Sequence, residues 1–183
     1  ADNELFLAGD VRANENPELQ SLQILFVREH NRIAAQAARE NSSWTDEQLY
    51  QYARRMVIAE LQKITYEEFL PALLGRNAMP AYRGYRDTVN PGIANEFATA
   101  AYRLGHSMLG EDIEFLDNDG EEIHEAIALR DAFFNPVVVQ ETDIDPILKY
   151  LASDNMQEID TFVVDDLRNF LFGAPGQGGF DLA

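Results

Sequence analysis

The sequence contains no cysteine among its 183 residues, and this absence excludes several kinds of chemistry. Disulfide bonds, thiolate catalysis, cysteine-ligated zinc and cysteine-ligated iron–sulfur clusters all need a residue that the chain lacks. No uninterrupted apolar run reaches about 18 residues, so the sequence predicts no membrane-spanning helix. A Gly-x-Ser-x-Gly elbow, a phosphate-binding P-loop and a dinucleotide fingerprint are also missing.

Basic residues are scarce as well. Lysine and arginine number 14 against 32 aspartates and glutamates, which gives a formal net charge of -18. Proteins that bind nucleic acid neutralise phosphates with lysine and arginine, so we expect no nucleic-acid partner. Apolar residues make up 46% of the chain and charged residues 25%, as is typical of a globular protein of one ordinary domain.

The two ends of the sequence predict a piece of a longer protein. The first residues, 1–4, carry no initiator methionine and do not form a signal peptide. The last residues follow a glycine-rich stretch over 173–179 and stop soon after it. We therefore expect a processed or excised segment.

Helix-start signals divide the first half of the chain. Asn16 and Pro17 place a capping side chain before a proline, and helical apolar spacing then continues to about Arg39. Thr45 to Gln48 forms a capping box for a second helix, and a short helical turn ends near Gly75.

The second half of the chain combines shorter elements. Asn90 and Pro91 repeat the cap-plus-proline pattern and predict a helix to about Met108. The remaining expectations are an irregular loop over 76–90, a β-hairpin over 113–123 around a turn at 117–120, and short helices near 145–152 and 160–172. The fold class predicted from these patterns is mainly α with one short β-hairpin.

Two of the three histidines fit ordinary structural positions. His124 follows two glutamates just after the predicted hairpin turn, which favours a solvated surface position. His30 falls one turn after Phe26 on the apolar stripe of the first helix. A half-buried histidine with satisfied hydrogen bonds is favoured there.

His106 stands apart from the apolar stripe of its predicted helix. At about 100° per residue it aligns with Asn95, Thr99 and Tyr102. The helix carries little charge, so we expect it to be buried on both sides, with one side free to meet a cofactor. Gly105 would let a large planar group approach the backbone. The pattern leaves two alternatives open: a core histidine with a hydrogen-bonded partner, or a cofactor ligand.

Two charged motifs have ordinary explanations when they are considered alone. Arg12 and Glu15, three residues apart before the first helix, are usually a solvated ion pair at a helix entrance. The acidic run over 117–121 has some features of a calcium loop. It lacks the flanking helices and the final glutamate of an EF-hand, so a hairpin turn is favoured.

Several long motifs, in a fixed order, carry information beyond spacing and composition. They are Phe6–Leu19 (FLAGDVRANENPEL), Leu25–Ala34 (LFVREHNRIA), Val57–Gly75 (VIAELQKITYEEFLPALLG), Ile93–Met108 (IANEFATAAYRLGHSM), Leu129–Pro136 (LRDAFFNP) and Ile144–Leu148 (IDPIL). Together they resemble haem peroxidases of the animal (peroxidasin–myeloperoxidase) superfamily. The resemblance covers nearly all of residues 1–183 and implies a helical haem-peroxidase core fragment, a partial domain. The absence of cysteine is compatible with a bacterial member.

The resemblance implies a role for four residues. His106 would be the proximal ligand of the haem iron, and Arg12 would be the distal arginine that assists O–O cleavage by stabilising negative charge on the departing oxygen. Glu15 aligns with a glutamate that forms an ester with a haem methyl group in several members, so the haem is expected to be b-type or covalently linked. Arg103 aligns with an arginine that pairs with a haem propionate.

Departures from the family pattern limit these expectations. Asn16 stands where the myeloperoxidase branch has a methionine bonded to a haem vinyl group, so efficient chloride oxidation is not expected. The family's distal histidine, its first ester-forming aspartate and its calcium loop align upstream of this segment. The asparagine that holds the proximal histidine aligns beyond Ala183. Calcium is therefore expected only in a full-length domain, and remaining peroxidase segments or chains are expected partners.

Three functional hypotheses follow. The first is part of a peroxidase that reduces hydrogen peroxide and oxidises a small reductant, which is an aromatic compound, a halide or a metal ion. Its location would be secreted, extracellular or at the cell surface, as the family implies. The second is a non-catalytic truncated helical module that binds haem or serves as an interaction domain. The third, a haem fatty-acid dioxygenase relative, is disfavoured because the Arg12–Glu15 motif has the peroxidase form.

Overall fold

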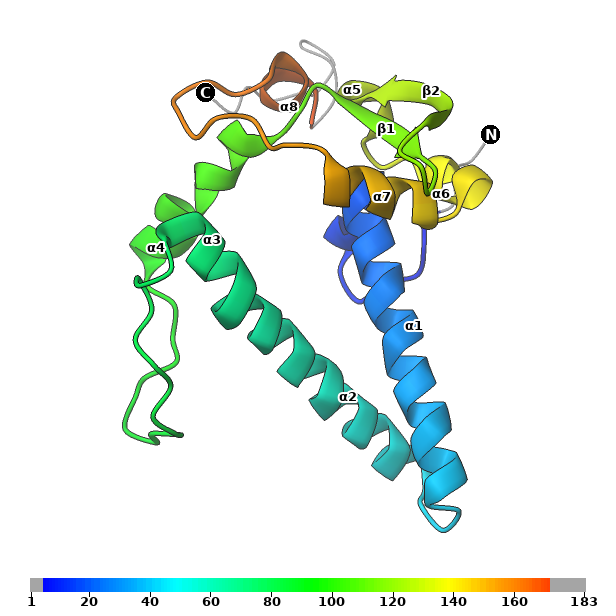
Figure 1. Cartoon of the computed structure of the whole chain (residues 1–183), viewed down its shortest axis with the longest axis vertical. Helices are drawn as coiled ribbons and strands as arrows, with labels where there is room; N and C mark the ends of the chain where they lie inside the picture. The colour runs from blue at the N-terminus through cyan, green and yellow to red at the C-terminus, as the bar shows by residue number, and fades with distance from the viewer. Residues whose placement is uncertain (1–4, 172–183) are drawn as a thin grey trace. The chain divides into compact units, whose positions relative to one another are not determined.

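A computed structural model of the chain describes residues 5–171. Packing divides the chain into two compact units. The first combines the residues up to Ile24 with those from Gly92 onward, and the second is Leu25–Pro91. Helices dominate, and one two-stranded antiparallel sheet is present in the described part (Figure 1). The predicted fold class is confirmed.

The elements of the first unit are mostly short. They are a 3-10 helix η1 (Val11–Asn14), α4 (Asn95–Thr99), a 3-10 helix η3 (Ala101–Met108), β1 (Asp112–Leu116), β2 (Glu122–Ala128), α5 (Leu129–Ala132), α6 (Val137–Thr142), α7 (Asp145–Ser153) and α8 (Asp165–Phe170). The long helix α1 (Pro17–Glu40) begins in this unit and continues into the second. There it is followed by α2 (Asp46–Lys63), a π-helical turn η2 (Ile64–Phe69) and α3 (Leu70–Leu74).

The two long helices begin where the capping signals predicted. The Asn16 side chain accepts a hydrogen bond from the Leu19 backbone N–H at 2.7 Å, just ahead of Pro17. At α2, the Thr45 hydroxyl accepts from the Gln48 backbone N–H while the Gln48 side chain accepts from the Thr45 N–H. Each contact satisfies backbone groups that a helix start leaves without partners.

The core of the first unit forms where the hairpin packs against helices from later in the chain. Strand β1 lies against α7 (Figure 1). One buried cluster joins Ile113, Leu116, Leu129, Ala132, Tyr150, Leu167 and Leu171. A second joins Phe115, Val138, Val139, Ile144 and Ile147. Burial of these side chains away from water is the main force that holds the unit together.

The hairpin turn is held by the Asp117 side chain. Its carboxylate accepts hydrogen bonds from the backbone N–H groups of Asp119 at 2.8 Å and Glu121 at 3.0 Å. These bonds lower the pKa of Asp117 because they favour the ionised form. Gly120 completes the turn with φ of 82°, a left-handed conformation that glycine adopts without strain.

Replacing Gly120 with alanine should destabilise the fold by about 1–2 kcal/mol, which is the cost of the left-handed conformation for a residue with a Cβ. A Cβ at Gly120 would meet no atom within 4 Å, so no steric clash contributes. Denaturant unfolding gives the measurement. Gly9→Ala is the control, because Gly9 also has open space but not a positive φ. Equal midpoints for the two variants would contradict the prediction.

The helix predicted from Asn90 to Met108 is wrong in its start and in its continuity. Helix α4 begins only at Asn95, with Ala94 at the cap position and no side-chain cap. It ends at Thr99, and Ala100, with φ of -127° and ψ of -70°, separates it from η3. Asn90-Pro91 therefore starts no helix here, and the α-helical period does not continue to Met108.

Other expectations were confirmed or refined. The structure confirms the irregular loop over 76–90 and the short helix near 145–152, and the last predicted helix begins at Asp165 rather than near residue 160. The sequence patterns missed η1, α5 and α6, which are each four to six residues long. The predicted loop over 173–179 lies outside the described residues. Within residues 5–171, no helix is both long enough and apolar enough to cross a membrane.

Candidate functional site

Arg12 is held by Asp10, a partner that the sequence analysis did not single out. The Asp10 carboxylate accepts hydrogen bonds from Arg12 Nε at 3.0 Å and from Nη2 at 2.5 Å. It also accepts from the Arg12 backbone N–H at 2.9 Å, so Asp10 both caps η1 and orients the guanidinium. These contacts lower the pKa of Asp10 to about 2. The side chain of Arg12 is 79% exposed and keeps its other N–H groups available for a ligand.

The Arg12 guanidinium pairs with Asp10, and Glu15 adds only a weaker electrostatic attraction to Arg12 in place of the ion pair that the isolated motif favoured. The Glu15 backbone is fixed from outside the motif. The Glu15 carbonyl accepts a hydrogen bond from the Phe134 N–H at 2.9 Å. Phe134 adopts φ of 51°, an uncommon conformation for a bulky residue. The contact links the Arg12–Glu15 segment to the residues that follow α5.

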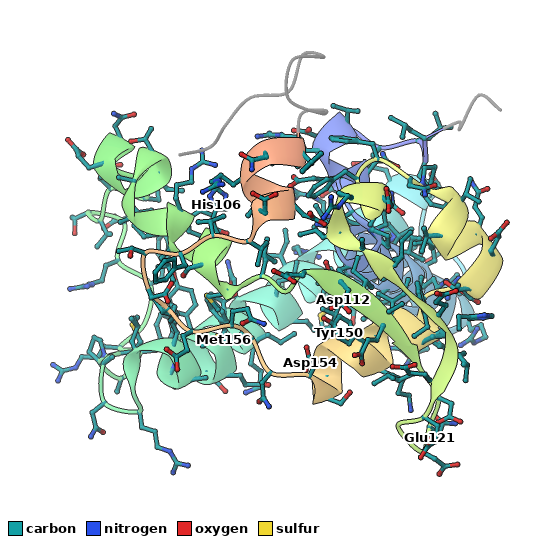
Figure 2. All side chains as sticks on the ribbon, turned by 90° about the horizontal axis from the view of Figure 1, so that it is seen from above. His106, Asp112, Glu121, Tyr150, Asp154 and Met156 are labelled. Carbon is teal, nitrogen blue, oxygen red and sulfur yellow. The ribbon has the colours of Figure 1, made fainter. Side chains whose placement is uncertain are left out.

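His106 lies in η3, a 3-10 helix of eight residues. Such helices rarely exceed three or four residues, so η3 is unusually long for its type. Figure 2 labels the position of His106. Its side chain is half-buried, and no described residue forms a hydrogen bond with its ring. The core-histidine alternative, which required a hydrogen-bonded partner, therefore finds no support within residues 5–171. Within that part of the chain, neither ring nitrogen has a hydrogen-bond partner.

The 3-10 geometry changes which residues share a face with His106. With three residues per turn, side chains at i and i+3 lie directly above one another. His106 therefore aligns with Arg103, whereas the α-helical period had aligned it with Tyr102 and Thr99. The earlier alignment is wrong because η3 is not α-helical. The two residues predicted to contact a cofactor thus lie on one face of one element.

The expectation that this helix is buried on both sides is also wrong. Every residue over 91–104 is exposed in the structure, and in η3 only Ser107 is buried. Exposed apolar side chains include Ile93, Phe97, Tyr102 and Leu104. The low charge of the segment creates apolar surface, but the described residues do not cover it. Surface of this kind typically binds a ligand or another protein segment.

Within the part of the chain that the structure describes, no polar contact joins the two halves of the predicted site. Among the described residues, no hydrogen bond or ion pair links Arg12 or Glu15 to Arg103 or His106. The segment with Arg12 contacts Phe134, while the end of η3 is held by the Met108 carbonyl, which accepts from the Gln157 N–H at 3.0 Å. Residues 5–171 contain no group of three or more acidic, histidine or cysteine side chains placed to hold a metal ion.

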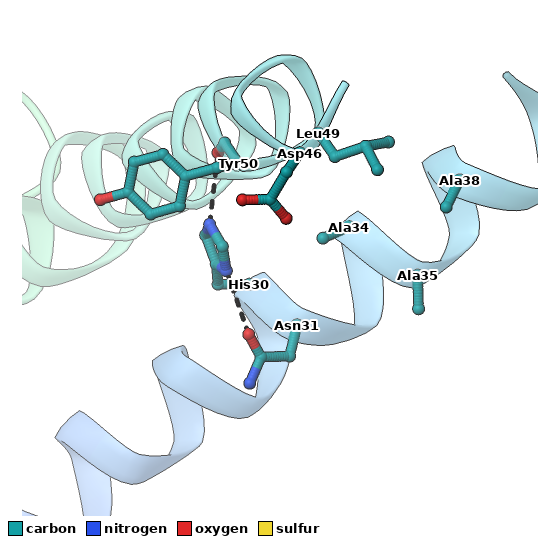
Figure 3. A pocket seen from close by; sticks show the side chains of 8 residues that line it. All are labelled: His30, Asn31, Ala34, Ala35, Ala38, Asp46, Leu49 and Tyr50. Carbon is teal, nitrogen blue, oxygen red and sulfur yellow. Dashed lines mark hydrogen bonds between the residues drawn. The ribbon is translucent and has the colours of Figure 1, made fainter. Parts of the chain in front are cut away.

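The second unit contains a separate hollow of about 390 Å³ between α1 and α2 (Figure 3). His30 lies at its edge, with Nε2 3.3 Å from the Tyr50 carbonyl and Nδ1 3.3 Å from the Asn31 side chain. The prediction of a half-buried, hydrogen-bonded His30 is confirmed. His124 is exposed, as predicted, and its ring meets Phe115 edge-on at 6.0 Å.

Comparison with known proteins identifies the family. A family model described as animal haem peroxidase matches residues 1–183. This chain belongs to the animal haem peroxidase family. It is 41% identical to peroxinectin A of Dictyostelium discoideum, covering 99% of this chain and 33% of that protein. Mouse myeloperoxidase is 44% identical, with 97% of this chain and 26% of that protein covered.

A solved structure gives the same result for the fold. Peroxidase A from Dictyostelium discoideum superposes with a TM-score of 0.91 and 41% sequence identity. The match covers 97% of this chain and 34% of that chain. The family resemblance and the helical peroxidase-fragment fold are thereby confirmed. The present chain spans about a third or less of the length of these relatives.

The residues of η3 fit the haem group that the family name implies. Haem would be held by a ring nitrogen on its iron, a cation at its propionates and apolar surface against its ring. His106 and Arg103 would offer the first two from one face of η3, and Phe97 and Leu104 are exposed nearby in the chain. A Cβ added at Gly105 would meet no atom within 4 Å, so the backbone beside His106 is open to a planar group.

Proposed function

We propose that this chain is the part of a haem-dependent peroxidase that supplies the proximal iron ligand and the arginine beside the reacting oxygen atoms. One observation carries the proposal. In a chain of the animal haem peroxidase family, the His106 ring has no hydrogen bond within the described residues and shares a 3-10 face with Arg103. A peroxidase built from this segment would act together with the remaining segments of a longer domain.

The proposed reaction converts hydrogen peroxide to water. Peroxide takes up two electrons and two protons and gives two water molecules, and the electrons come from an aromatic compound, a halide or a metal ion. Haem, when bound, would supply the redox-active iron. His106 would hold that iron through a ring nitrogen, and the planar fork of Arg103 would pair with a propionate.

Arg12 would act on charge that develops as the O–O bond breaks. A guanidinium is permanently cationic, so it stabilises negative charge on the departing oxygen without a proton transfer. Asp10 already fixes the Nε and Nη2 side of the guanidinium. Part of the conformational entropy that this side chain must lose is therefore already lost before substrate binds. Glu15, next to this group, would provide the carboxylate for a covalent haem ester.

Adding hemin to the purified chain should shift the Soret band, and the His106→Ala variant should lose that shift, because the variant lacks the ring nitrogen that would bind the iron. His124→Ala is the matched control, since His124 is exposed and belongs to the hairpin, and it should keep the shift. Absorption titration measures both. Identical spectra for the wild type and His106→Ala would contradict the proposal and favour the non-catalytic module.

Several wider properties remain predictions from the family. Secreted or cell-surface location, covalent linkage of the haem through Glu15 and calcium in the full-length domain belong to this group. The same is true of association with the remaining peroxidase segments. The exposed apolar residues over 93–104 support that last prediction, because they leave surface for another segment to cover.

A further inference from the structure

Two buried amide side chains fix the backbone of the Arg12–Glu15 segment. Asn14 is 1% exposed and Gln20 is 2% exposed, although their neighbours Arg12 and Glu15 reach solvent. The Gln20 side chain donates a hydrogen bond from Nε2 to the Asn14 carbonyl at 3.0 Å. The first turns of α1 thus hold η1 through a side chain that the proposed chemistry does not use.

Asn14 holds the same segment from the other side. Its Oδ1 accepts a hydrogen bond from the Phe6 N–H at 2.9 Å, and its Nδ2 donates to the Phe6 carbonyl at 3.0 Å. Both backbone groups of Phe6 are therefore paired with one side chain, much as they would be with a neighbouring strand. The Glu15 carbonyl is held in turn by Phe134.

Packing alone does not explain a glutamine at position 20. Its Oε1 is buried without a hydrogen-bond partner among the described residues. A buried acceptor without a partner disfavours folding, and an unbranched apolar residue would fill the same space without that penalty. The amide uses its donor, Nε2, which bonds to the backbone carbonyl of Asn14, between Arg12 and Glu15.

We propose that Asn14 and Gln20 are positioning residues that hold the Arg12–Glu15 backbone in the conformation the peroxidase reaction requires. The proposal rests on the proposed function for the role of the segment, and on the hydrogen bonds above for how the segment is held. Neither residue touches the reacting atoms. They act by fixing the main chain from which the Arg12 and Glu15 side chains project.

The test compares Gln20→Met with the matched control Gln23→Met, which changes an exposed glutamine of the same helix. Amide hydrogen exchange is followed by NMR on the full chain without haem. The reporters are the N–H groups of Ala13 and Glu15, which donate to the carbonyls of Asp10 and Arg12, both at 3.1 Å. In Gln20→Met their protection should fall about five- to tenfold, the effect of one lost hydrogen bond. The Leu148 amide of α7, which donates to Ile144 at 2.9 Å, should be unchanged.

A second variant separates hydrogen bonding from space filling. In Gln20→Glu the introduced carboxyl can donate to the Asn14 carbonyl only when it is protonated. Protection of Ala13 and Glu15, corrected for intrinsic exchange rates, should therefore be low at neutral pH and should recover as pH falls. A side chain that merely fills space would give no such local pH profile, while Leu148 serves as the internal reference.

Two results would overturn the proposal. One is full protection of Ala13 and Glu15 in Gln20→Met, and the other is an equal loss at Leu148, which would mean that Gln20 only supports the fold. If Gln20→Met does not fold, Asn14→Ala replaces it, with loss of protection at Ala13 and Glu15 expected and unchanged protection contradicting the proposal. Because the exchange is measured without haem, a failed hemin titration would leave this result intact.

Discussion

Replacing Arg130 with methionine should destabilise the folded chain by about 3–5 kcal/mol, the usual cost of leaving a buried charge without its partner. The Asp166 side chain is only 5% exposed, and its Oδ1 lies 2.6 Å from Arg130 Nη2. Its other oxygen, Oδ2, accepts from the Arg130 backbone N–H and from Nε, both at 3.1 Å. Methionine keeps the unbranched stem but removes the positive charge.

Removing the negative charge of the pair should lower the unfolding free energy less than removing the positive charge does. In Asp166→Asn the partner that remains is Arg130, whose side chain is 47% exposed and can be hydrated. We expect a loss of about 1–3 kcal/mol, typical of a hydrogen bond to a charged group. Arg130 also stacks over the Phe170 ring at 4.9 Å, a contact that Asp166→Asn preserves. The asymmetry between the two variants distinguishes a buried charge pair from an ordinary surface pair.

The neighbouring pair of Asp165 and Arg168 provides the control. These side chains are 59% and 45% exposed, and Asp165 Oδ1 lies 3.1 Å from Arg168 Nη2. Arg168→Met should therefore change the unfolding free energy by about 1 kcal/mol or less. Chemical denaturation of all three variants at neutral pH gives the comparison. A loss for Arg130→Met no larger than that for Arg168→Met would show that Asp166 does not depend on its partner.

This ion pair also supports the candidate site. Arg130 lies in α5 and Asp166 in α8, so the pair fixes the short helix that ends two residues before Phe134. The Phe134 N–H holds the Glu15 carbonyl. A chain of contacts thus runs from a buried carboxylate to the segment that carries Arg12. None of these distant partners could be found from sequence spacing, because residues 130 and 166 belong to separate short helices.

Local signals predicted the parts of the fold that depend on neighbouring residues. The Thr45–Gln48 capping box, the Asn16–Pro17 helix start and the turn around Gly120 all form as expected. Each depends on hydrogen bonds or backbone angles within a few residues. The break at Ala100 and the 3-10 helix after it could not be predicted from an apolar stripe that fits a continuous α-helix equally well.

The candidate site divides in the same way. The motifs selected Arg12, Glu15, Arg103 and His106, and their family is confirmed, while the roles of these residues remain proposals. The sequence did not indicate that Arg12 pairs with Asp10. One signal was available, because an aspartate two residues before the first N–H of a turn commonly accepts from it. That Arg103 and His106 share a face could be recognised only once η3 was known to be a 3-10 helix.

Replacing Glu18 with glutamine should stabilise the folded chain above pH 7 by about 3 kcal/mol. Burial raises the pKa of Glu18 from its ordinary value of 4.5 to about 7, because the half-buried carboxylate loses hydration. In the unfolded chain the same group ionises near its ordinary value. Between these two pKa values the folded chain binds more protons, so its stability falls as pH rises from about 4.5 to about 7. The expected stabilisation of the variant follows from about 1.4 kcal/mol for each unit of pKa shift.

The difference between wild type and Glu18→Gln, measured by denaturation from pH 4 to pH 8, isolates this one group. The two should be equally stable near pH 4 and should diverge toward pH 8, with the variant more stable. Glu47→Gln is the matched control, because Glu47 occupies the first turn of α2 but is exposed. That variant should lose about 0.3–1 kcal/mol, since a carboxylate favours a helix N-terminus when water still reaches it. If Glu18→Gln also loses stability at pH 8, the helix dipole outweighs burial at this position.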